Sequence, residues 1–379
     1  LDQLLVDPSI NEAPLSEQFD ENSNPNGQIN YSNKNETSSL VLALLLGGSD
    51  TSEKLNQASP HSYGAIHIAS QAENQAVLNK IKNRMSSRRS LYRIKQYTTT
   101  EDWQTFVSGA ASIGTYEEDE FDQEIDLNSQ GTILGVEKQI FDGSSLGAFF
   151  NYTNIDGDLS NPGGDLSGNS YQFGLFGSQV FMSNLYLDTV LWGGLKSFDM
   201  SRNVLGSSVS SEPDVTDFGG SVDLSYRFDD VSRGVHITPT IGITANQLSV
   251  DGFSESGTLG ALDVESFDIT SLQTKLGVAM DFDLMKPSLR NAHYATAGID
   301  LAWLHEFGDE AADITSSFKN TNTDSFEVTS GGLKRNYMLF GANFQYHLAP
   351  DYTFDLNWDL LWNSYYTNNT FEFSFTYWF

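Results

Sequence analysis

Positive charge in this sequence is concentrated in one short stretch. The 379 residues include 50 acidic and only 20 basic side chains, for a formal net charge of −30. Seven of the 20 bases nevertheless fall between positions 80 and 95, and no acidic residue occurs between Glu73 and Glu101. Such a stretch is either a solvated basic face or a surface that docks against acids elsewhere in the chain. We expect docking, and the bases expected to take part are Lys80, Lys82, Arg84, Arg88 and Arg89.

Residues for other kinds of chemistry are sparse. His236, His293, His305 and His347 are scattered, and no G-x-S-x-G or similar nucleophile motif accompanies them. No cluster has the spacing of metal ligands, and no cofactor is indicated. The strong negative charge argues against a general nucleic-acid binder.

The basic stretch falls at the end of a predicted helix. Ser59 and Pro60 form a helix-start signal, with the serine as N-cap and the proline in the first helical position. About 28 helical residues would be about 42 Å long, somewhat more than the ~30 Å hydrocarbon core of a bilayer. Apolar residues recur along this helix at spacings of three to four or near multiples of them, at Ile66, Ala69, Val77, Ile81 and Met85.

From position 103 onward the sequence predicts one β-strand after another. Short turns alternate with longer loops, as in bacterial outer-membrane barrels. No run approaches the roughly 18–20 apolar residues of a membrane-spanning helix. The fold prediction is an all-β transmembrane protein, a twelve-stranded antiparallel outer-membrane β-barrel with an N-terminal α-helix in its lumen; a two-sheet sandwich is the alternative. The twelve segments are 103–115, 130–141, 146–156, 169–181, 184–200, 216–228, 234–248, 265–283, 293–306, 333–348, 352–366 and 370–379.

Alternation within these segments predicts which side chains face the membrane. The last eleven residues, NTFEFSFTYWF, place an aromatic ring at every second position, so one face of that strand is aromatic and the other mostly polar. A twelve-stranded lumen is about wide enough for one helix. Inward-facing acids are therefore the predicted partners of the basic cluster. The candidates are Glu137, Asp188, Asp300, Asp355, Asp359 and Glu372.

Two short motifs bracket this pattern and carry a family resemblance. The segment Lys54–Tyr63, KLNQASPHSY, is similar to an L-N-Q-x-S-x-x-x-Y box, and the chain ends Tyr377-Trp378-Phe379. From about residue 54 onward the chain resembles the C-terminal translocator domain of a type Va autotransporter, in which a passenger precedes a linker helix and a twelve-stranded barrel. The resemblance implies that the chain anchors and exports an N-terminal passenger to the cell surface by type V secretion. A barrel enzyme of the lipase or protease kind and a small porin are the alternatives.

The resemblance also implies partners and residue roles. The expected partners are outer-membrane lipid and lipopolysaccharide, the barrel-assembly machinery, periplasmic chaperones and the chain's own passenger; the protein itself is expected to be a monomer. Phe375, Tyr377 and Phe379 are the expected assembly signal. Some family members cut their passenger by cyclisation of a helix asparagine. Asn79 occupies the similar position, but Lys80 replaces the usual second asparagine, so we expect an ordinary helix residue there.

Composition divides the chain into three regions. Residues 1–58 are rich in Asn, Ser, Asp and Glu and are expected to be a largely irregular passenger remnant or linker. Residues 59–95 are the expected lumen-spanning helix, and residues 96–379 the translocator barrel. The opening LDQLLVDPS lacks an initiator Met and a signal peptide, which suits a mature form or a trimmed chain. The absence of cysteine fits passage through an oxidising compartment.

Overall fold

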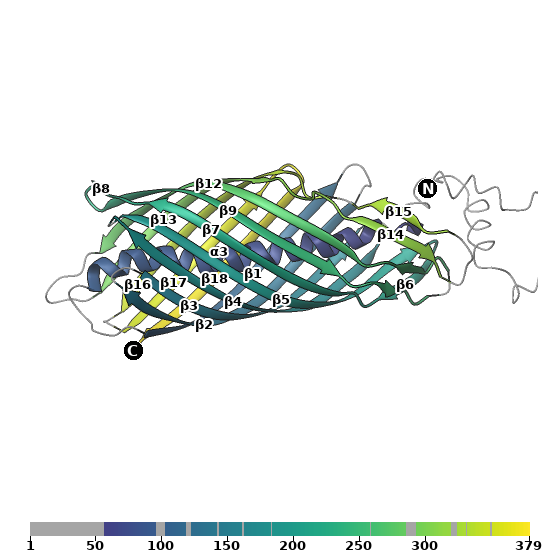
Figure 1. The fold of residues 1–379 in the computed structure, drawn as a ribbon, viewed down its shortest axis with the longest axis horizontal. Coiled ribbons are helices and arrows are strands. Elements are labelled where there is room, and N and C mark those ends of the chain that lie inside the picture. Colours follow the sequence, from purple (N-terminus) through teal and green to yellow (C-terminus); the bar gives the residue numbers. More distant parts are fainter. Residues whose placement is uncertain are drawn as a thin grey trace, which may run out of the picture.

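Twelve antiparallel strands form a closed barrel around a long helix in the computed structural model (Figure 1). The structure describes residues 57–95, 103–118, 123–141, 144–160, 163–182, 184–257, 259–285, 293–319, 324–330, 332–348 and 351–379. Each strand pairs with its neighbour in the chain, and the first pairs with the last, so that Val107 lies opposite Phe375. The predicted fold class is confirmed. The barrel strands are β1 (Trp103–Glu118), β2 (Gln123–Phe141), β3 (Ser144–Leu159), β4 (Gly164–Phe181), β5 (Leu185–Val204), β7 (Asp214–Tyr226), β9 (Val235–Val250), β12 (Phe267–Met285), β13 (Tyr294–Glu306), β16 (Asn336–Leu348), β17 (Tyr352–Trp362) and β18 (Tyr366–Trp378).

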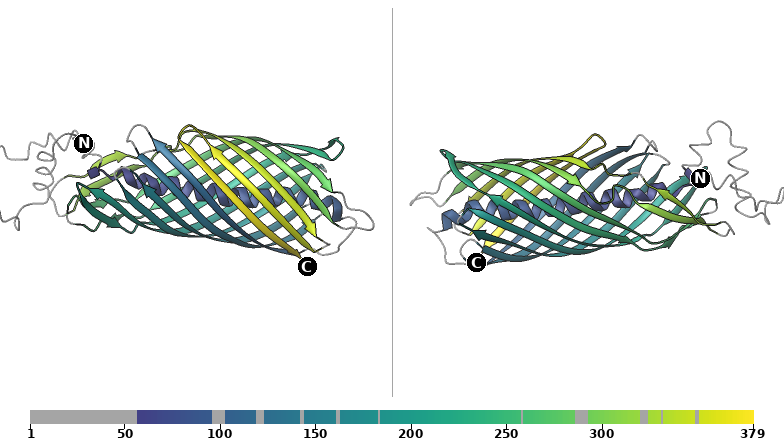
Figure 2. Two further views of the ribbon diagram at one scale, coloured as in Figure 1. Left: turned by 180° about the vertical axis from the view of Figure 1, so that it is seen from behind. Right: turned by 45° about the horizontal axis from the view of Figure 1, so that its top comes forward.

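The two ends of the barrel differ. Connections are short at the end where β1 begins and β18 finishes, whereas the opposite end carries additional short strands (Figure 2). Outer-membrane barrels have short periplasmic turns and longer extracellular loops, so the additional strands mark the outer end. Four of them form a separate sheet, here called the outer sheet: β10 (Phe253–Ser254), β11 (Leu262–Val264), β14 (Asp313–Phe318) and β15 (Phe326–Thr329). A fifth, β6 (Ser207–Ser211), extends the barrel sheet beside β5 at this end, whereas β8 (Phe228–Ser232) lies beside the start of β9 at the inner end.

Some predicted strand boundaries are wrong. The prediction ended one strand at 366 and began the next at 370, but the turn lies between Trp362 and Tyr366. The Asn363 side-chain oxygen accepts hydrogen bonds from the backbone N–H groups of Tyr365, at 2.8 Å, and Tyr366, at 2.7 Å. Asparagine often stabilises a turn in this way. Strand β2 also begins well before the predicted 130, and the predicted loops at 201–215, 249–264 and 307–332 contain short strands.

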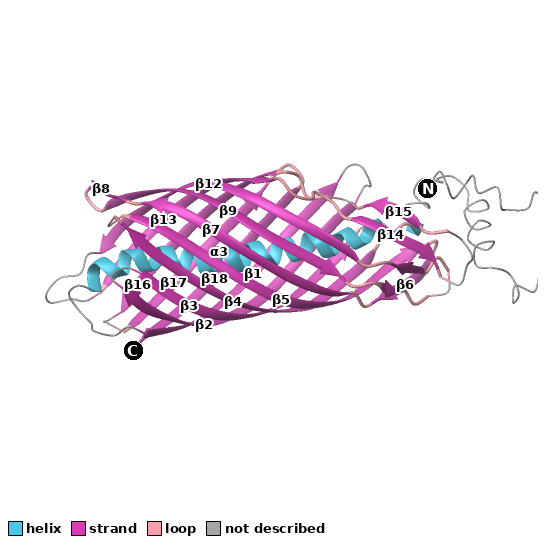
Figure 3. Cartoon of the chain, in the orientation of Figure 1, coloured by secondary structure: helices cyan, strands magenta, loops and turns pink. Residues whose placement is uncertain are grey.

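The helix runs along the lumen from the outer end to the inner end (Figure 3). A 3₁₀ turn, η2 (Pro60–Tyr63), precedes α3 (Gly64–Lys95). The α-helix thus begins later than predicted, because Pro60 opens the 3₁₀ turn and Ser59 makes no side-chain capping bond. The Ser59 hydroxyl instead lies 2.5 Å from His61 Nδ1. Among the described helices, none is both long and apolar enough to cross a membrane.

The strands confirm the predicted alternation of faces. On β18, Phe371 and Phe373 are about half exposed, while Glu372 and Ser374, which alternate with them, are buried toward the lumen. An apolar cluster lies in the outer half of the lumen, where helix residues such as Ile66 pack against the wall and the outer sheet. Further along, aromatic rings lie close against glycines of neighbouring strands. A Cβ added at Gly135, for example, would be 2.2 Å from the Phe106 ring.

Candidate functional site

The helix and the lumen wall meet in a buried charge cluster. Lys196 Nζ on β5 lies 2.9 Å from Glu73 Oε2 on α3 and 3.4 Å from Asp217 Oδ2 on β7. It also donates a hydrogen bond to Asn74 Oδ1 of the helix at 3.1 Å. All three charged side chains are almost fully buried. The cluster therefore joins the helix to two strands through one lysine.

Amide side chains surround this cluster. Gln172 Nε2 donates to Asn74 Oδ1 at 2.7 Å and to Asp217 Oδ2 at 3.3 Å. Asn151 Nδ2 donates to Glu73 Oε1 at 3.2 Å. Buried hydrogen bonds of this kind restrain the groups that they join, because displacing one member leaves others without partners. The helix is thus held in one position relative to β3, β4, β5 and β7.

The basic end of the helix pairs with the wall at two further points. Lys82 Nζ lies 2.8 Å from Asp223 Oδ1 on β7. The other oxygen of Asp223 is 3.9 Å from Lys275 Nζ on β12. One inward carboxylate therefore lies between a base of the helix and a base of the wall.

Arg84 connects the helix to the seam where the barrel closes. Its guanidinium lies 3.4 Å from Glu137 Oε2 on β2 and donates to Gln104 Oε1 on β1 at 2.8 Å. It also donates to Thr376 Oγ1 on β18 at 2.8 Å, and it stacks 3.8 Å above the Phe106 ring. One helix side chain thus contacts the first, second and last strands.

All six predicted acids point into the lumen, but they differ in what they contact. Glu137 pairs with Arg84, and Asp359 accepts a hydrogen bond from Asn83 of the helix at 3.3 Å. The other four accept hydrogen bonds from the wall: Asp188 from Ser178, Asp300 from Asn343, Asp355 from Gln345, and Glu372 from Ser108 and Asn357.

The predicted bases also have different placements. Lys82 and Arg84 form the pairs described above, and Lys80 is buried in the lumen. The side chains of Arg88 and Arg89 lie outside the described residues. Asn79 is buried, and its Oδ1 accepts a hydrogen bond from Gln75 Nε2 at 2.8 Å. That Asn79 is an ordinary helix residue stays a prediction.

The sequence prediction missed the central cluster. We looked for helix bases and wall acids, whereas Glu73 is a helix acid and Lys196 a wall base. A signal was available, since Glu73 is the only acid between positions 59 and 95. Alternation along β5 also turns Lys196 inward in a strongly acidic barrel. Two inward acids of β7, Asp217 and Asp223, were overlooked in the same way.

One histidine is less isolated than the sequence suggested. His236 Nδ1 lies 3.1 Å from Asp229 Oδ1, and Nε2 lies 3.3 Å from Asp283 Oδ2. Arg227 Nε also contacts Asp229, at 3.0 Å. Each ring nitrogen of His236 therefore faces a carboxylate oxygen. The geometry thus favours a structural role, in which His236 is held between two acidic side chains of the wall.

The last strand closes the barrel with its aromatic face outward. Phe379 N–H donates to the Trp103 carbonyl at 3.0 Å, and Trp103 N–H donates back at 3.3 Å. The Tyr377 ring stacks between Tyr352, at 5.3 Å, and Phe379, at 5.9 Å. Phe375 also stacks on Tyr352, at 5.9 Å. The three predicted signal residues therefore form one outward aromatic cluster.

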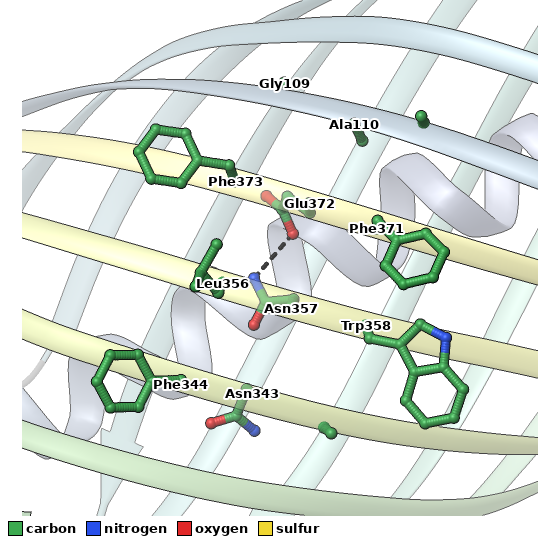
Figure 4. Close-up of a pocket in the computed structure, with 12 residues that line it drawn as sticks. Gly109, Ala110, Asn343, Phe344, Leu356, Asn357, Trp358, Phe371, Glu372 and Phe373 are labelled. Atoms are coloured by element: carbon green, nitrogen blue, oxygen red, sulfur yellow. Dashed lines mark hydrogen bonds between the residues drawn. The ribbon is translucent and has the colours of Figure 1, made fainter.

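A shallow hollow of about 600 Å³ lies on the outward face beside this seam (Figure 4). Small side chains of β1, such as Ala111, border it on one side, and the rings of Phe371, Phe373 and Trp358 line it. Glu372 directs its carboxylate to Asn357, at 2.9 Å (Figure 4). The hollow is therefore part of the apolar face and not a polar reaction site.

Comparisons with known proteins agree with this architecture. A family model described as Autotransporter beta-domain matches residues 105–359. Curated protein sequences give no match. The translocator domain of the autotransporter NalP from Neisseria meningitidis has a similar structure, with a TM-score of 0.62 and 12% identity over 81% of this chain and 98% of that one. The β domain of the Bordetella autotransporter BrkA is also similar, with a TM-score of 0.53 and 13% identity over 74% of this chain and 100% of that one.

Proposed function

The chain belongs to the autotransporter β-domain family, and we propose that its lumen helix is the tether between this barrel and an exported passenger. The barrel is a translocator of type V secretion in the bacterial outer membrane, linked to a passenger. The helix enters the lumen at the outer end. A passenger joined to the N-terminal side of the helix is therefore held at the cell surface.

The buried pairing of Glu73 with Lys196 is the observation that carries this proposal. Both side chains are almost fully inaccessible to solvent. Glu73 belongs to the tether helix and Lys196 to the barrel wall. Removing one partner from a buried ion pair destabilises a structure by about 3–5 kcal/mol, because the remaining charge is left without compensation. A helix held this strongly resists being pulled out of the lumen by its load.

We assign the three regions accordingly. Residues 1–58 are a passenger remnant or linker, residues 59–95 the lumen tether, and residues 96–379 the translocator barrel. The basic cluster from Lys80 to Arg89 supplies the charges that hold the inner part of the tether against inward acids. The pairs of Lys82 with Asp223 and Arg84 with Glu137 support this assignment.

The outward aromatic cluster of β18 suits recognition during assembly. Phe375, Tyr377 and Phe379 are the proposed signal for the barrel-assembly machinery, with periplasmic chaperones as earlier partners. The finished barrel is a monomer that contacts outer-membrane lipid and lipopolysaccharide. Its closed lumen, filled by the helix, supports a tethering role over that of a small porin.

An epitope tag at residue 1 tests the export direction. On intact cells we expect added protease to remove the tag while a periplasmic marker protein stays intact. A tag that remains protected until the outer membrane is permeabilised would contradict the proposal. Single-channel recording of the purified chain distinguishes the tethering function from the porin alternative. A barrel filled by its helix should conduct far less than an open pore of the same strand number.

A further inference from the structure

A second buried polar site lies at the outer end of the lumen. The carboxylate of Glu255, between β10 and β11, is fully buried. Arg202 of β5 donates to it from Nε at 2.5 Å and from Nη2 at 2.7 Å. The backbone N–H of Leu262 in the outer sheet donates to it at 2.7 Å. The barrel side thus forms a charged pair that is anchored in both β5 and the outer sheet.

The segment that precedes the helix binds to this pair with neutral groups. The Tyr63 hydroxyl donates to Glu255 Oε1 at 2.5 Å and lies 3.0 Å from Ser211 Oγ. Arg202 Nη1 donates to the Gln57 carbonyl at 2.7 Å. Leu205 N–H donates to the Gln57 side-chain oxygen at 3.2 Å. Both Gln57 and Tyr63 belong to the KLNQASPHSY box. The tethering role alone does not explain why these residues occur there.

Apolar packing makes this site sensitive to position. Tyr63 is 2% exposed and packs edge-to-face against Phe253 of the outer sheet, with ring centroids 4.8 Å apart. Burial, followed by the charge of Glu255, raises the pKa of the Tyr63 hydroxyl, so it remains a donor. A shift of the segment by one residue would place Ser62 or Gly64 beside Glu255. Neither side chain reaches as far as a tyrosine hydroxyl.

We propose that Glu255, Arg202, Ser211 and Leu205 form a receptor for the segment Gln57–Tyr63, which stops the exported chain and sets its final register. The proposal rests on the tethering function. It adds which residues stop the movement of the exported chain through the barrel. Binding joins the outer sheet to the tether, because Glu255 contacts Tyr63 and Leu262 together. In this proposal the segment Gln57–Tyr63 also closes the outer end of the barrel when it binds.

A single thiol can report on this site, because the chain contains no cysteine. Ser62 is 1% exposed and lies next to Tyr63. We would introduce Ser62→Cys and measure its reaction with a membrane-impermeant maleimide on intact cells. Tyr63→Phe removes one hydroxyl and keeps the ring. Tyr116→Phe is the matched control, since Tyr116 is also buried at the outer end and donates to the Gly332 carbonyl at 2.8 Å.

We expect Tyr63→Phe to increase the labelling rate at least about tenfold, the effect of losing a hydrogen bond to a charged group, and Tyr116→Phe to leave it unchanged. Heat-modifiable mobility on gels checks that every variant is folded. Equal labelling in the two folded variants would overturn the proposal. The residue-1 epitope is scored in the same cells. A surface-exposed epitope with unchanged labelling rejects only the receptor, whereas a periplasmic epitope rejects the tethering function itself.

Discussion

Lys196 of the barrel wall and Glu73 of the lumen helix form an ion pair of 2.9 Å in which neither side chain has appreciable contact with solvent. Asp217 lies 3.4 Å from the same ammonium group, so one positive charge stands between two carboxylates. In a buried site both carboxylates depend on this one ammonium group for compensation of their charge. The pair therefore links the position of the helix to the integrity of the barrel.

Replacing Lys196 by methionine should release the helix. Lys196→Met leaves Glu73 and Asp217 buried without a cation, and we expect a loss of about 3–5 kcal/mol in the stability of the helix-filled state. Thermal unfolding and single-channel conductance both measure it. The control is Lys275→Met, because Lys275 is partly exposed and 3.9 Å from Asp223; its loss should be no more than about 1 kcal/mol. Equal effects of the two variants would contradict a central role for Lys196.

Glycine is required where an aromatic ring lies against the neighbouring strand. Gly135→Ala would place a methyl group 2.2 Å from the Phe106 ring, and overpacking of this kind destabilises by about 1–3 kcal/mol. At Gly109 no atom lies within 4 Å of an added Cβ, so Gly109→Ala is a suitable control and should be tolerated. Denaturant titration of the two folded barrels compares them. A Gly135→Ala barrel as stable as Gly109→Ala would show that Phe106 moves aside freely.

Acid should loosen the outer end of the barrel. Burial, assisted by the charge of Arg202, lowers the pKa of His61 to about 4, whereas an exposed histidine titrates near pH 6.5. Between these values the open form binds a proton that the closed form excludes, so the closed form loses stability as pH falls from about 6.5 toward 4. At about pH 5.5 the expected loss is roughly 1–2 kcal/mol.

The Ser62→Cys reporter measures this effect as a labelling rate that rises on acidification, after correction for the pH dependence of thiol reactivity in an exposed control. His61→Gln cannot take up the proton, so its labelling should be nearly independent of pH over the same range. If the two chains show the same dependence, His61 is not the group responsible.

Two phenylalanines of similar exposure allow the proposed assembly signal to be tested. Phe379 is 49% and Phe371 54% exposed on the same face. Simple loss of apolar surface predicts comparable effects for Phe379→Ala and Phe371→Ala. Recognition by assembly factors predicts a much lower yield of membrane-inserted barrel for Phe379→Ala. Quantifying the heat-modifiable form in outer-membrane fractions distinguishes these outcomes, and equal yields would reject the signal.

Much of the barrel could be predicted from the sequence because strand alternation is local. A period of two puts Phe371 and Glu372 on opposite faces whatever the remaining chain does. Strand ends were harder to predict. The turn at Asn363 depends on two side-chain hydrogen bonds to backbone N–H groups, and the residues after it continue the same alternation. The outer sheet was missed because its strands are too short to show a period.

The sequence by itself determined that this is an acidic twelve-stranded barrel with a basic helix before it, because charge, loop lengths and alternation are properties of neighbouring residues. Only the tertiary structure decided that Glu73 meets Lys196 and that Tyr63 meets Glu255. Those contacts depend on how far the strands are staggered around the barrel and on how the helix is rotated within it. Both quantities arise from packing of the whole chain, so local patterns do not reveal them.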